Sequence, residues 1–296
     1  MPTKNHLLLL FFCCVTSYSF AQTNKTKDST NHTPTAADTL AARNHSDTLK
    51  KHKVVSFGPA SFDFNLDKGK SGKQNFYIIN RKDKAYQVNL TVKDFMRDSV
   101  GNILFYDAGT TKNSAANWIT LDKTYLEVPP GKIGTVVVTV NVPDSVNTDQ
   151  MKWAMIVADV PSENLPPHKS GNITTILENK IKVGSHVYVN FPGLSKELKM
   201  LSFKPNTDST YQIAIKNVGG AQIRCNVSIE VASQLTGEKK TFTEEDVPLF
   251  PEQIRLLQFK LPKGSFPVGK YTLVALADAL DDDVPLEAAQ LEVELK

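Results

Sequence analysis

The chain has 296 residues, a length that favours two domains at roughly 150 residues per domain. Hydrophobic residues make up 41% of the sequence and charged residues 22%, which is typical of a globular chain and excludes a collagen-like, wholly disordered or polytopic membrane protein. The formal net charge is +3, and its excess is confined to one segment near the N-terminus.

The first 21 residues have the pattern of a secretory signal peptide. Lys4 precedes an apolar run from Leu7 to Val15, and the small residues Ser19 and Ala21 stand where signal peptidase requires them. The run is shorter than the about 20 apolar residues of a membrane-spanning helix. We therefore expect export and cleavage after Ala21.

The three cysteines bear on the fate of the exported chain. Lipid modification of Cys13 or Cys14 is the alternative to cleavage after Ala21, and the bulky Phe11 and Phe12 before them disfavour it. After cleavage Cys225 is the single cysteine, so the mature chain forms no intramolecular disulfide. No second long apolar run follows, so we expect no transmembrane segment in the mature chain.

Residues 22–53 are predicted to be a disordered linker. They contain no aromatic residue, and their apolar surface is too small to offset the entropy of ordering the backbone. Six basic and three acidic residues give the linker +3, which leaves residues 54–296 with about −1 once Lys4 is removed. A nucleic-acid partner needs a clustered basic face. We find no such cluster in residues 54–296, and we expect no nucleic-acid binding.

Beyond residue 53 the hydrophobic pattern predicts an all-β protein. Apolar residues alternate with a period of two, and Gly, Pro, Asn and Asp interrupt the pattern about every ten residues. Clear strands are predicted at Phe62–Phe64, Phe76–Ile79, Tyr86–Val92, Val136–Val140 and Lys152–Val157. The stretch Gly69–Lys73 lacks the spacing of a phosphate-binding loop and is interpreted as a hairpin turn. The predicted large core residues are Trp118, Trp153, Tyr188 and Tyr271.

The second half of the chain repeats the order of the first. Asn80, which precedes the strand Tyr86–Val92, matches Asn217, which precedes an alternating strand through Val231. The segment Pro129–Ile133 in turn matches Phe250–Ile254, and a further strand follows each of them. The order of motifs therefore indicates a duplicated fold.

The two halves differ by one insertion. The spacing from the matched asparagine to the matched proline is 50 positions in the first half and 34 in the second, so the first half carries about sixteen extra residues. The segment Met96–Lys112 fits this insertion, with a tight turn at Val100–Asn102. We therefore predict an inserted hairpin.

Each half has about seven predicted strands, which over roughly 100 to 140 residues is the size of an immunoglobulin-like β-sandwich. Phe191-Pro192-Gly193 breaks the pattern and marks the boundary. The predicted organisation is a signal peptide at 1–21, a linker at 22–53, a sandwich with an inserted hairpin at 54–192 and a second sandwich at 193–296.

No set of residues in the sequence is spaced like the ligands of a metal centre or the groups of a catalytic centre. His168 follows a proline-rich loop and His186 lies on a strand, and neither has a second ligand at metal spacing. Cys225 has no local histidine or second cysteine and is predicted to be a small buried residue. We therefore expect no catalytic residue, no metal, no cofactor and no enzymatic activity.

Acidic clusters provide the alternatives to this expectation. Asp94 with Asp98, and the run Glu244–Asp246, have the residue types of a glycosidase pair. An alternative cation site is a run of three carboxylates, Asp281, Asp282 and Asp283. Because the spaced ligands and glycine of a calcium loop are absent, a solvated turn is the simpler interpretation of this run.

Two regions are predicted to contact a partner. Phe105 and Tyr106 in the inserted hairpin are candidates to project beyond the sandwich, although the general bias of aromatic residues toward burial favours capping of the core. The loop Pro161–His168 is the second candidate.

Several short stretches carry a family resemblance. In chain order they are Phe62-Asp63-Phe64, Gly69-Lys70, Phe76–Asn80, Tyr86-Gln87-Val88, Asp98–Ile103, Pro130-Gly131-Lys132, Val136–Val140 and Val142-Pro143. This order resembles the first domain of WxL-interacting proteins, and the second half is similar to their second domain. Those are bacterial surface proteins with two immunoglobulin-like domains, the first implicated in binding peptidoglycan and the second in binding host or partner proteins.

The resemblance has departures and a competitor. The family ends in a membrane helix and a basic tail, whereas this sequence stops at Lys296, and the family's glycine-rich strand is replaced by Lys152–Met155. The stretches Trp118–Thr120, Pro130-Gly131 and Val142-Pro143 also resemble pilus chaperones of the PapD type. Such a chaperone has a basic pair for the terminal carboxylate of its subunit, and no matching arginine and lysine is identified.

The sequence thus predicts an exported, non-enzymatic binding protein of the bacterial cell envelope, periplasmic or on the cell surface. Its expected partner is a cell-wall polymer such as peptidoglycan or an envelope protein, bound by exposed strand edges and end loops. The alternative is a PapD-like periplasmic chaperone for the assembly of surface or pilus subunits, and an enzyme is the third hypothesis.

Overall fold

The computed structural model describes residues 55–161, 168–170, 173–175, 180–207 and 209–295. The predicted signal peptide at 1–21 and the linker at 22–53 lie outside the described residues, and so does the interior of the loop Pro161–His168. The chain divides into two units, Met1–His52 and Lys53–Lys296, and the structure below belongs to the second.

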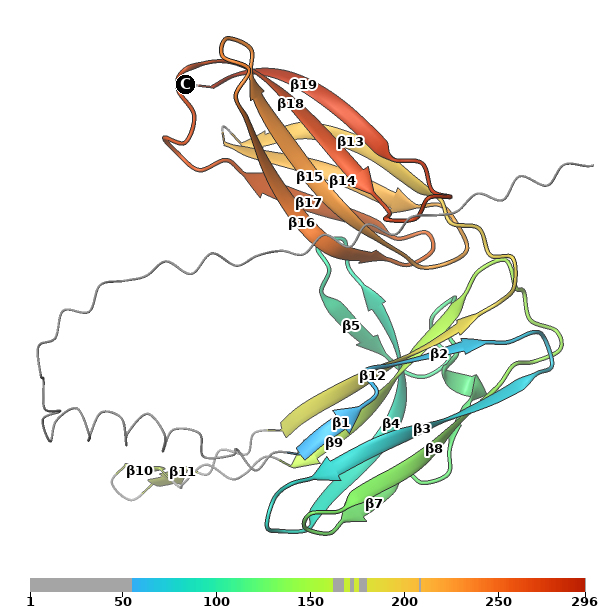
Figure 1. The fold of residues 1–296 in the computed structure, drawn as a ribbon. Helices are drawn as coiled ribbons and strands as arrows, with labels where there is room; N and C mark the ends of the chain where they lie inside the picture. Colours follow the sequence, from blue (N-terminus) through green and yellow to red (C-terminus); the bar gives the residue numbers. More distant parts are fainter. Residues whose placement is uncertain (1–54, 162–167, 171–172, 176–179, 208, 296) are drawn as a thin grey trace, which may run out of the picture. The chain divides into compact units, whose positions relative to one another are not determined.

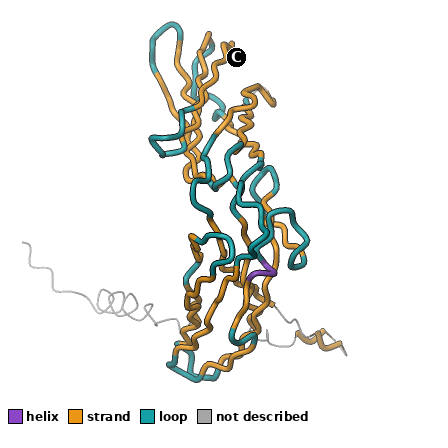
Figure 2. Tube along the Cα trace, turned by 90° about the vertical axis from the view of Figure 1, so that its right-hand side faces the viewer, coloured by secondary structure: helices purple, strands orange, loops and turns teal. Residues whose placement is uncertain are grey.

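The regular secondary structure of the described chain consists almost entirely of strands, as Figures 1 and 2 show. The strands of the first half are β1 (Val55–Gly58), β2 (Ser61–Asn65), β3 (Ser71–Asn80), β4 (Tyr86–Arg97), β5 (Ile103–Tyr106), β6 (Ile119–Leu121), β7 (Tyr125–Val128), β8 (Ile133–Asn141), β9 (Lys152–Pro161), β10 (His168–Ser170), β11 (Ile173–Thr175) and β12 (Lys180–Asn190). Those of the second half are β13 (Leu198–Thr207), β14 (Thr210–Asn217), β15 (Ile223–Ser233), β16 (Lys239–Leu249), β17 (Ile254–Lys260), β18 (Gly269–Asp278) and β19 (Glu287–Leu295). The prediction of an all-β protein is confirmed.

Helical structure is minimal. One 3-10 turn, η1 (Ala116–Trp118), interrupts the described strands. Within the part of the chain that the structure describes, no helix has the length and apolar character needed to cross a bilayer.

The first half forms a sandwich of two sheets. One sheet has the strand order β1-β3-β8-β6 and the other has the order β2-β12-β9-β4-β5, with β7 also pairing with β4. Strict alternation of apolar residues places one face of each strand in a common core, which includes the fully buried side chains of Phe62, Phe76, Ile78, Val88, Val136 and Ile156. Burial of this face is the main stabilising contribution.

The second half forms its own sandwich. Its sheets have the orders β13-β14-β17 and β16-β15-β18-β19. A separate core contains Ile213, Ile215, Cys225, Ile229, Leu249, Leu273 and the predicted core residue Tyr271. The tandem immunoglobulin-like architecture is therefore observed, with separate sheets and separate cores on either side of residues 191–197.

A buried asparagine occupies the same place in both sandwiches. Asn80 Nδ2 donates to the backbone oxygens of Lys84 and Val128, both at 2.8 Å, and its Oδ1 accepts from Lys82 N at 2.9 Å. Asn217 Nδ2 donates to Ala221 O at 2.8 Å and Leu249 O at 3.0 Å, and its Oδ1 accepts from Gly219 N at 2.9 Å. Both asparagines are completely buried. The duplication seen in the sequence extends to these hydrogen bonds.

One prediction about the first half is wrong, and the predicted core residues are confirmed in part. Gly69–Lys73 does not make a hairpin, because β2 and β3 on either side of it belong to different sheets. Trp153 is buried, but it lies outside the sandwich core in a third cluster with Phe95 and Phe250, where Tyr188 packs at the margin. Trp118 is only partly buried at the edge of the first core.

Candidate binding site

The edge of β12 is the first candidate surface. This strand pairs with β9 along its whole length, but it pairs with β2 only from His186 to Asn190. The nitrogen of His186 donates to Ala60 O at 2.9 Å, so the even-numbered residues of β12 direct their backbone groups away from β9. Among the described residues, no strand covers the outward backbone groups of Lys182 and Gly184.

This free edge results from the path of the preceding chain. β1 pairs with β3 in one sheet, and after Gly58 the chain crosses to the other sheet, where β2 runs parallel to β12. Ser185 Oγ donates to Pro59 O at 2.9 Å where the crossing ends. Among the described strands, the first half of β12 therefore has no neighbour on that side, while Val183 packs its side chain against the core.

A second candidate is the aromatic cluster where the two sandwiches meet. The rings of Trp153 and Phe250 lie 4.7 Å apart, and those of Phe95 and Phe250 lie 5.6 Å apart. The indole nitrogen of Trp153 donates to Phe95 O at 2.9 Å, so the buried polar group of the indole has its partner. Phe250 of the second sandwich thus inserts between two aromatic residues of the first.

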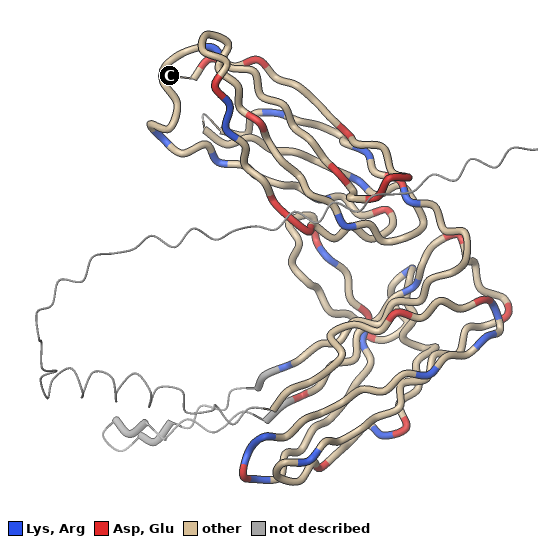
Figure 3. The backbone as a smooth tube through the Cα atoms, in the orientation of Figure 1, with Lys and Arg blue, Asp and Glu red and all other residues tan. Residues whose placement is uncertain are grey.

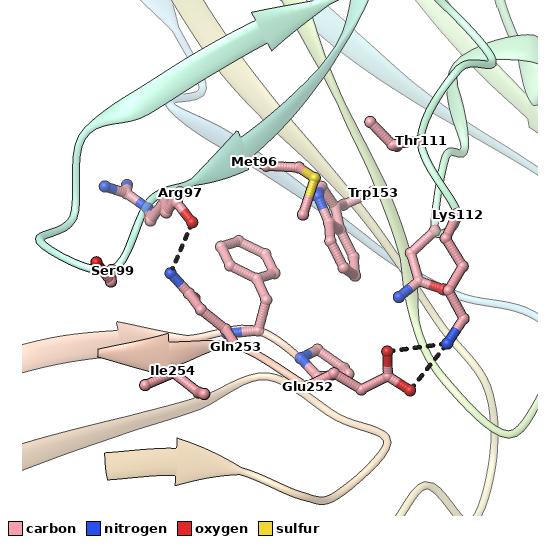
Figure 4. A pocket seen from close by; sticks show the side chains of 12 residues that line it. Met96, Arg97, Ser99, Thr111, Lys112, Trp153, Glu252, Gln253 and Ile254 are labelled. Atoms are coloured by element: carbon pink, nitrogen blue, oxygen red, sulfur yellow. Dashed lines mark hydrogen bonds and ion pairs between the residues drawn. The ribbon is translucent and has the colours of Figure 1, made fainter. Parts of the chain in front are cut away.

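A cavity of about 380 Å³ lies beside this cluster, as Figure 4 shows. Its apolar lining comes mainly from Met96, Trp153, Phe250, Pro251 and Ile254. This composition suits an apolar side chain better than a sugar or a phosphate.

Charged groups join the two sandwiches at the rim of the cavity. Lys112 Nζ donates to both carboxylate oxygens of Glu252, at 2.8 and 2.9 Å (Figure 4). Gln150 Nε2 donates to the same carboxylate at 3.1 Å. The hydrogen bond from Lys112 lowers the pKa of Glu252 below its usual range. Lys152 lies close by, where burial lowers the pKa of its ammonium group and its Nζ donates to Asn113 Oδ1 at 2.8 Å. The sequence-based reasoning missed this group of residues.

The inserted hairpin is also part of the junction. The turn Asp98–Asn102 joins β4 to β5, which confirms the predicted hairpin. Its tip contacts the second sandwich, because Leu256 N donates to Ser99 O at 2.7 Å and Arg255 Nη2 donates to Val100 O at 3.3 Å. Gly101 has a φ of 102° and lies so close to the Arg255 guanidinium that a Cβ there would meet it at 2.5 Å. The hairpin thus bridges the sandwiches.

The predicted contact residues Phe105 and Tyr106 lie on β5, behind this tip. Phe105 is 52% exposed and Tyr106 is 40% exposed, so neither caps the core. His168 belongs to β10 and pairs with Thr175 of β11 through the backbone. The other loop residues near His168 lie outside the described residues.

The acidic residues considered for catalysis have structural partners. Asp94 is fully buried and accepts hydrogen bonds from Thr111 N and Oγ1 and from Ser114 Oγ. Asp98 is half-buried and holds the hairpin turn, where the side-chain hydrogen bond from Asn102 lowers the pKa of Asp98. Each carboxylate therefore stabilises a turn or loop of the inserted segment.

The acidic run near residue 281 has a partner as well. Asp281 forms an ion pair with Lys196, whose hydrogen bond lowers the pKa of this carboxyl, and Asp281 also accepts from Asp283 N. In the described ranges, no three or more His, Cys, Asp or Glu side chains are grouped so that they could hold a metal ion. Acidic and basic residues are interspersed along both sandwiches in Figure 3.

His186 and Cys225 are held in apolar surroundings. The ring of His186 lies between Phe95, at 5.1 Å, and Tyr188, at 5.6 Å, and burial followed by the charge of Arg97 lowers the pKa of this histidine. Cys225 is fully buried, and burial raises the pKa of its thiol to about 12. At neutral pH this cysteine is therefore protonated and weakly nucleophilic.

The chain is similar to several solved structures of pilus-assembly proteins. A chain from a chaperone–tip adhesin complex, described as vital for synergistic activation of CFA/I fimbriae biogenesis, is 9% identical, with 81% of this chain and 98% of that chain covered and a TM-score of 0.45. A chain of the CsuC–CsuE pre-assembly complex from Acinetobacter baumannii is 10% identical, with coverage of 71% and 92% and a TM-score of 0.41. The E. coli chaperone DraB is 14% identical, with coverage of 82% and 97% and a TM-score of 0.39.

No protein-family model matches the chain, and no curated protein matches its sequence. The resemblance to WxL-interacting proteins therefore stays a prediction.

Proposed function

We propose that this chain is an exported, non-enzymatic protein that binds an extended segment of a protein partner along the free edge of β12. The single observation that supports it most is the pair of outward backbone groups at Lys182 and Gly184, which no described strand covers. An exposed strand edge of this kind is the surface to which another polypeptide adds as a strand.

The chemistry of the edge favours a polypeptide over a cell-wall polymer. A strand offers alternating donors and acceptors at the spacing of another strand, and a sugar chain does not. The apolar cavity beside Trp153 and Phe250 likewise suits an apolar side chain of a protein. We therefore favour a protein partner over peptidoglycan.

The most specific form of this proposal is a periplasmic chaperone for the assembly of surface or pilus subunits. The signal-peptide pattern in residues 1–21 supports export. Such subunits expose an unfilled strand position before assembly, which β12 would fill from its free edge.

The test removes one backbone donor and leaves the fold in place. Lys182→Pro eliminates the outward N–H of Lys182 but none of the hydrogen bonds that join β12 to β9, because residues 181, 183 and 185 make those bonds. Lys182→Ala is the matched control, because it removes the same charge and keeps the N–H. Circular dichroism melts check that both variants are folded.

The binding assay has two arms. In one, each variant is pulled down on purified peptidoglycan; in the other, each variant is used to capture proteins from a periplasmic extract. We expect the chain and its Lys182→Ala variant to retain the same envelope protein in stoichiometric amount, and Lys182→Pro to lose it. A peptide from the retained protein should then slow amide exchange at Lys182 and Gly184. The proposal is contradicted if the chain is retained on peptidoglycan and Lys182→Pro leaves that retention unchanged. It is also contradicted if Lys182→Pro and Lys182→Ala capture the envelope protein equally.

A further inference from the structure

The β4–β5 hairpin carries the densest group of exposed apolar side chains in the described chain. Met96, Val100, Leu104, Phe105 and Tyr106 are between 40% and 58% exposed. Leu104 and Tyr106 lie on one face of β5 and Phe105 on the other, so both faces of this sheet margin carry exposed apolar side chains. Exposed apolar side chains on a sheet margin favour an interaction there.

β5 is the margin of its sheet and has an unused side. It pairs only with β4 among the described strands, with Met96 opposite Leu104 and Phe95 opposite Phe105. Asn102 O accepts from Asp98 N, so the even-numbered residues of this strand bond to β4. The backbone groups of Ile103 and Phe105 consequently point outward, and none of the described strands covers them.

We propose that β5 is a self-association surface that pairs antiparallel with β5 of a second copy of this chain. Only one symmetric register pairs the outward backbone groups of both Ile103 and Phe105 with residues of β5 in the second copy. It sets Ile103 opposite Phe105 of the second copy and Leu104 opposite its own counterpart, and each Ile103–Phe105 pair exchanges both backbone hydrogen bonds. The sheet then continues across the two-fold axis.

A second copy of β5 matches this edge without opposing charges. The four residues of β5 carry no charge, so apolar side chains face apolar side chains along the whole strand. In the same register Asp107 lies opposite Gly101 of the second copy, and no like charges meet. Asp107 is also already neutralised within its own chain by Lys93, at 2.8 Å. The strand is therefore complementary to itself.

The length of β5 limits the strength of this association. A pairing of two four-residue strands buries much less than the roughly 800 Å² per partner of a standard stable interface. We therefore expect a monomer–dimer equilibrium that shifts with protein concentration rather than a permanent dimer.

Cysteine cross-linking tests the register directly. Leu104 would lie opposite its counterpart in a non-hydrogen-bonded pair, where the Cβ atoms are about 4.5 to 5.5 Å apart and a disulfide can form with little movement. In the chain from residue 22 onward, the buried Cys225 is the only other thiol. We expect Leu104→Cys to form a covalent dimer under mild oxidation with copper phenanthroline. Val100→Cys is the control, because it is more exposed but lies away from the axis.

A second measurement keeps the test independent of the introduced thiols. For the unmodified chain, the average mass from light scattering should rise with protein concentration. Phe105→Lys should keep the mass of a monomer, because it places a charge opposite Ile103 of the second copy. Equal cross-linking at positions 100 and 104, or a monomer mass at every concentration, overturns the proposal. Neither result affects binding at β12, because Lys182 lies on a different strand of that sheet.

Discussion

The two sandwiches use the same buried asparagine, but they differ at the turn that follows. In the first sandwich the third residue after Val128 is Gly131, with a φ of 69°; in the second, the third residue after Leu249 is Glu252, with a φ of 65°. This left-handed conformation is readily adopted by glycine and disfavoured for glutamate. Glu252 is held there by Lys112 and Gln150. The second sandwich thus accepts local backbone strain where the contact with the first requires a carboxylate.

The largest expected effect tests whether the asparagines are equivalent. Asn80→Ala and Asn217→Ala each remove the hydrogen bond to one buried carbonyl oxygen, those to the partly buried carbonyl oxygens and that from one N–H, so we expect each to lower the free energy of unfolding by about 3 kcal/mol. Urea unfolding measures the loss. The exposed Asn75→Ala is the control and should change little. A loss below about 1 kcal/mol for either buried asparagine would show that the two networks differ in energy.

Smaller changes in the unfolding free energy are expected from substitutions at Gly131 and Glu252, the left-handed residues of the two turns. Gly131→Ala places a Cβ where nothing lies within 4 Å, so backbone strain alone should lower the unfolding free energy by about 1 kcal/mol. Glu252→Gly relieves that strain but loses an exposed ion pair of less than about 1 kcal/mol, so we expect little net change. Thermal melts in low and high salt measure both. A large loss for Glu252→Gly would mean that the contact with Lys112 outweighs the strain.

The next effect is the pH dependence of the unfolding free energy that His186 of the first sandwich causes. The pKa of His186 is lowered from 6.5, mainly by burial, so below about pH 6.5 the unfolded chain binds a proton that the folded chain does not. The unfolding free energy should therefore be highest above this pH and fall as the pH drops toward the folded pKa. Urea melts across this range measure it. His186→Gln should remove this part of the pH dependence, and an unchanged slope would contradict the assignment.

The smallest effect compares two strands at equivalent places. Counting from the matched asparagines, Cys225 of the second sandwich corresponds to Val88 of the first, and both are fully buried. We expect Cys225→Val to change the unfolding free energy by less than about 1 kcal/mol, because shape and apolar character are kept. The native thiol, with a pKa of about 12, should resist a disulfide reagent at pH 8 until urea unfolds the chain. Rapid native labelling would contradict its burial.

The fold could be predicted from sequence because its signals are local. Alternation with a period of two is visible in Tyr86–Val92, and the repeat is visible in the matched asparagines and prolines. The pairing of strands is not local. Gly69–Lys73 looked like a hairpin because turn residues do not specify which sheet the next strand joins.

The candidate site was predicted only in part for the same reason. Phe105 and Tyr106 were recognised as aromatic residues in an insertion, but the contact of the hairpin tip with Leu256 depends on long-range packing. One signal was available in the repeat itself. The proline-glycine turn of the first half aligns with Pro251-Glu252, and a charged residue at a glycine position indicates a special role.

The bond between Leu256 N and Ser99 O has a mechanical consequence. The sandwiches are joined by the covalent segment between Asn190 and Leu198, by the contacts of Phe250 and Glu252 with the first sandwich, and by this hairpin tip. A body attached at several points resists rotation that a single linker would allow. Any hinge movement between them must therefore either release the tip or carry the whole hairpin, and with it the exposed strand β5, along.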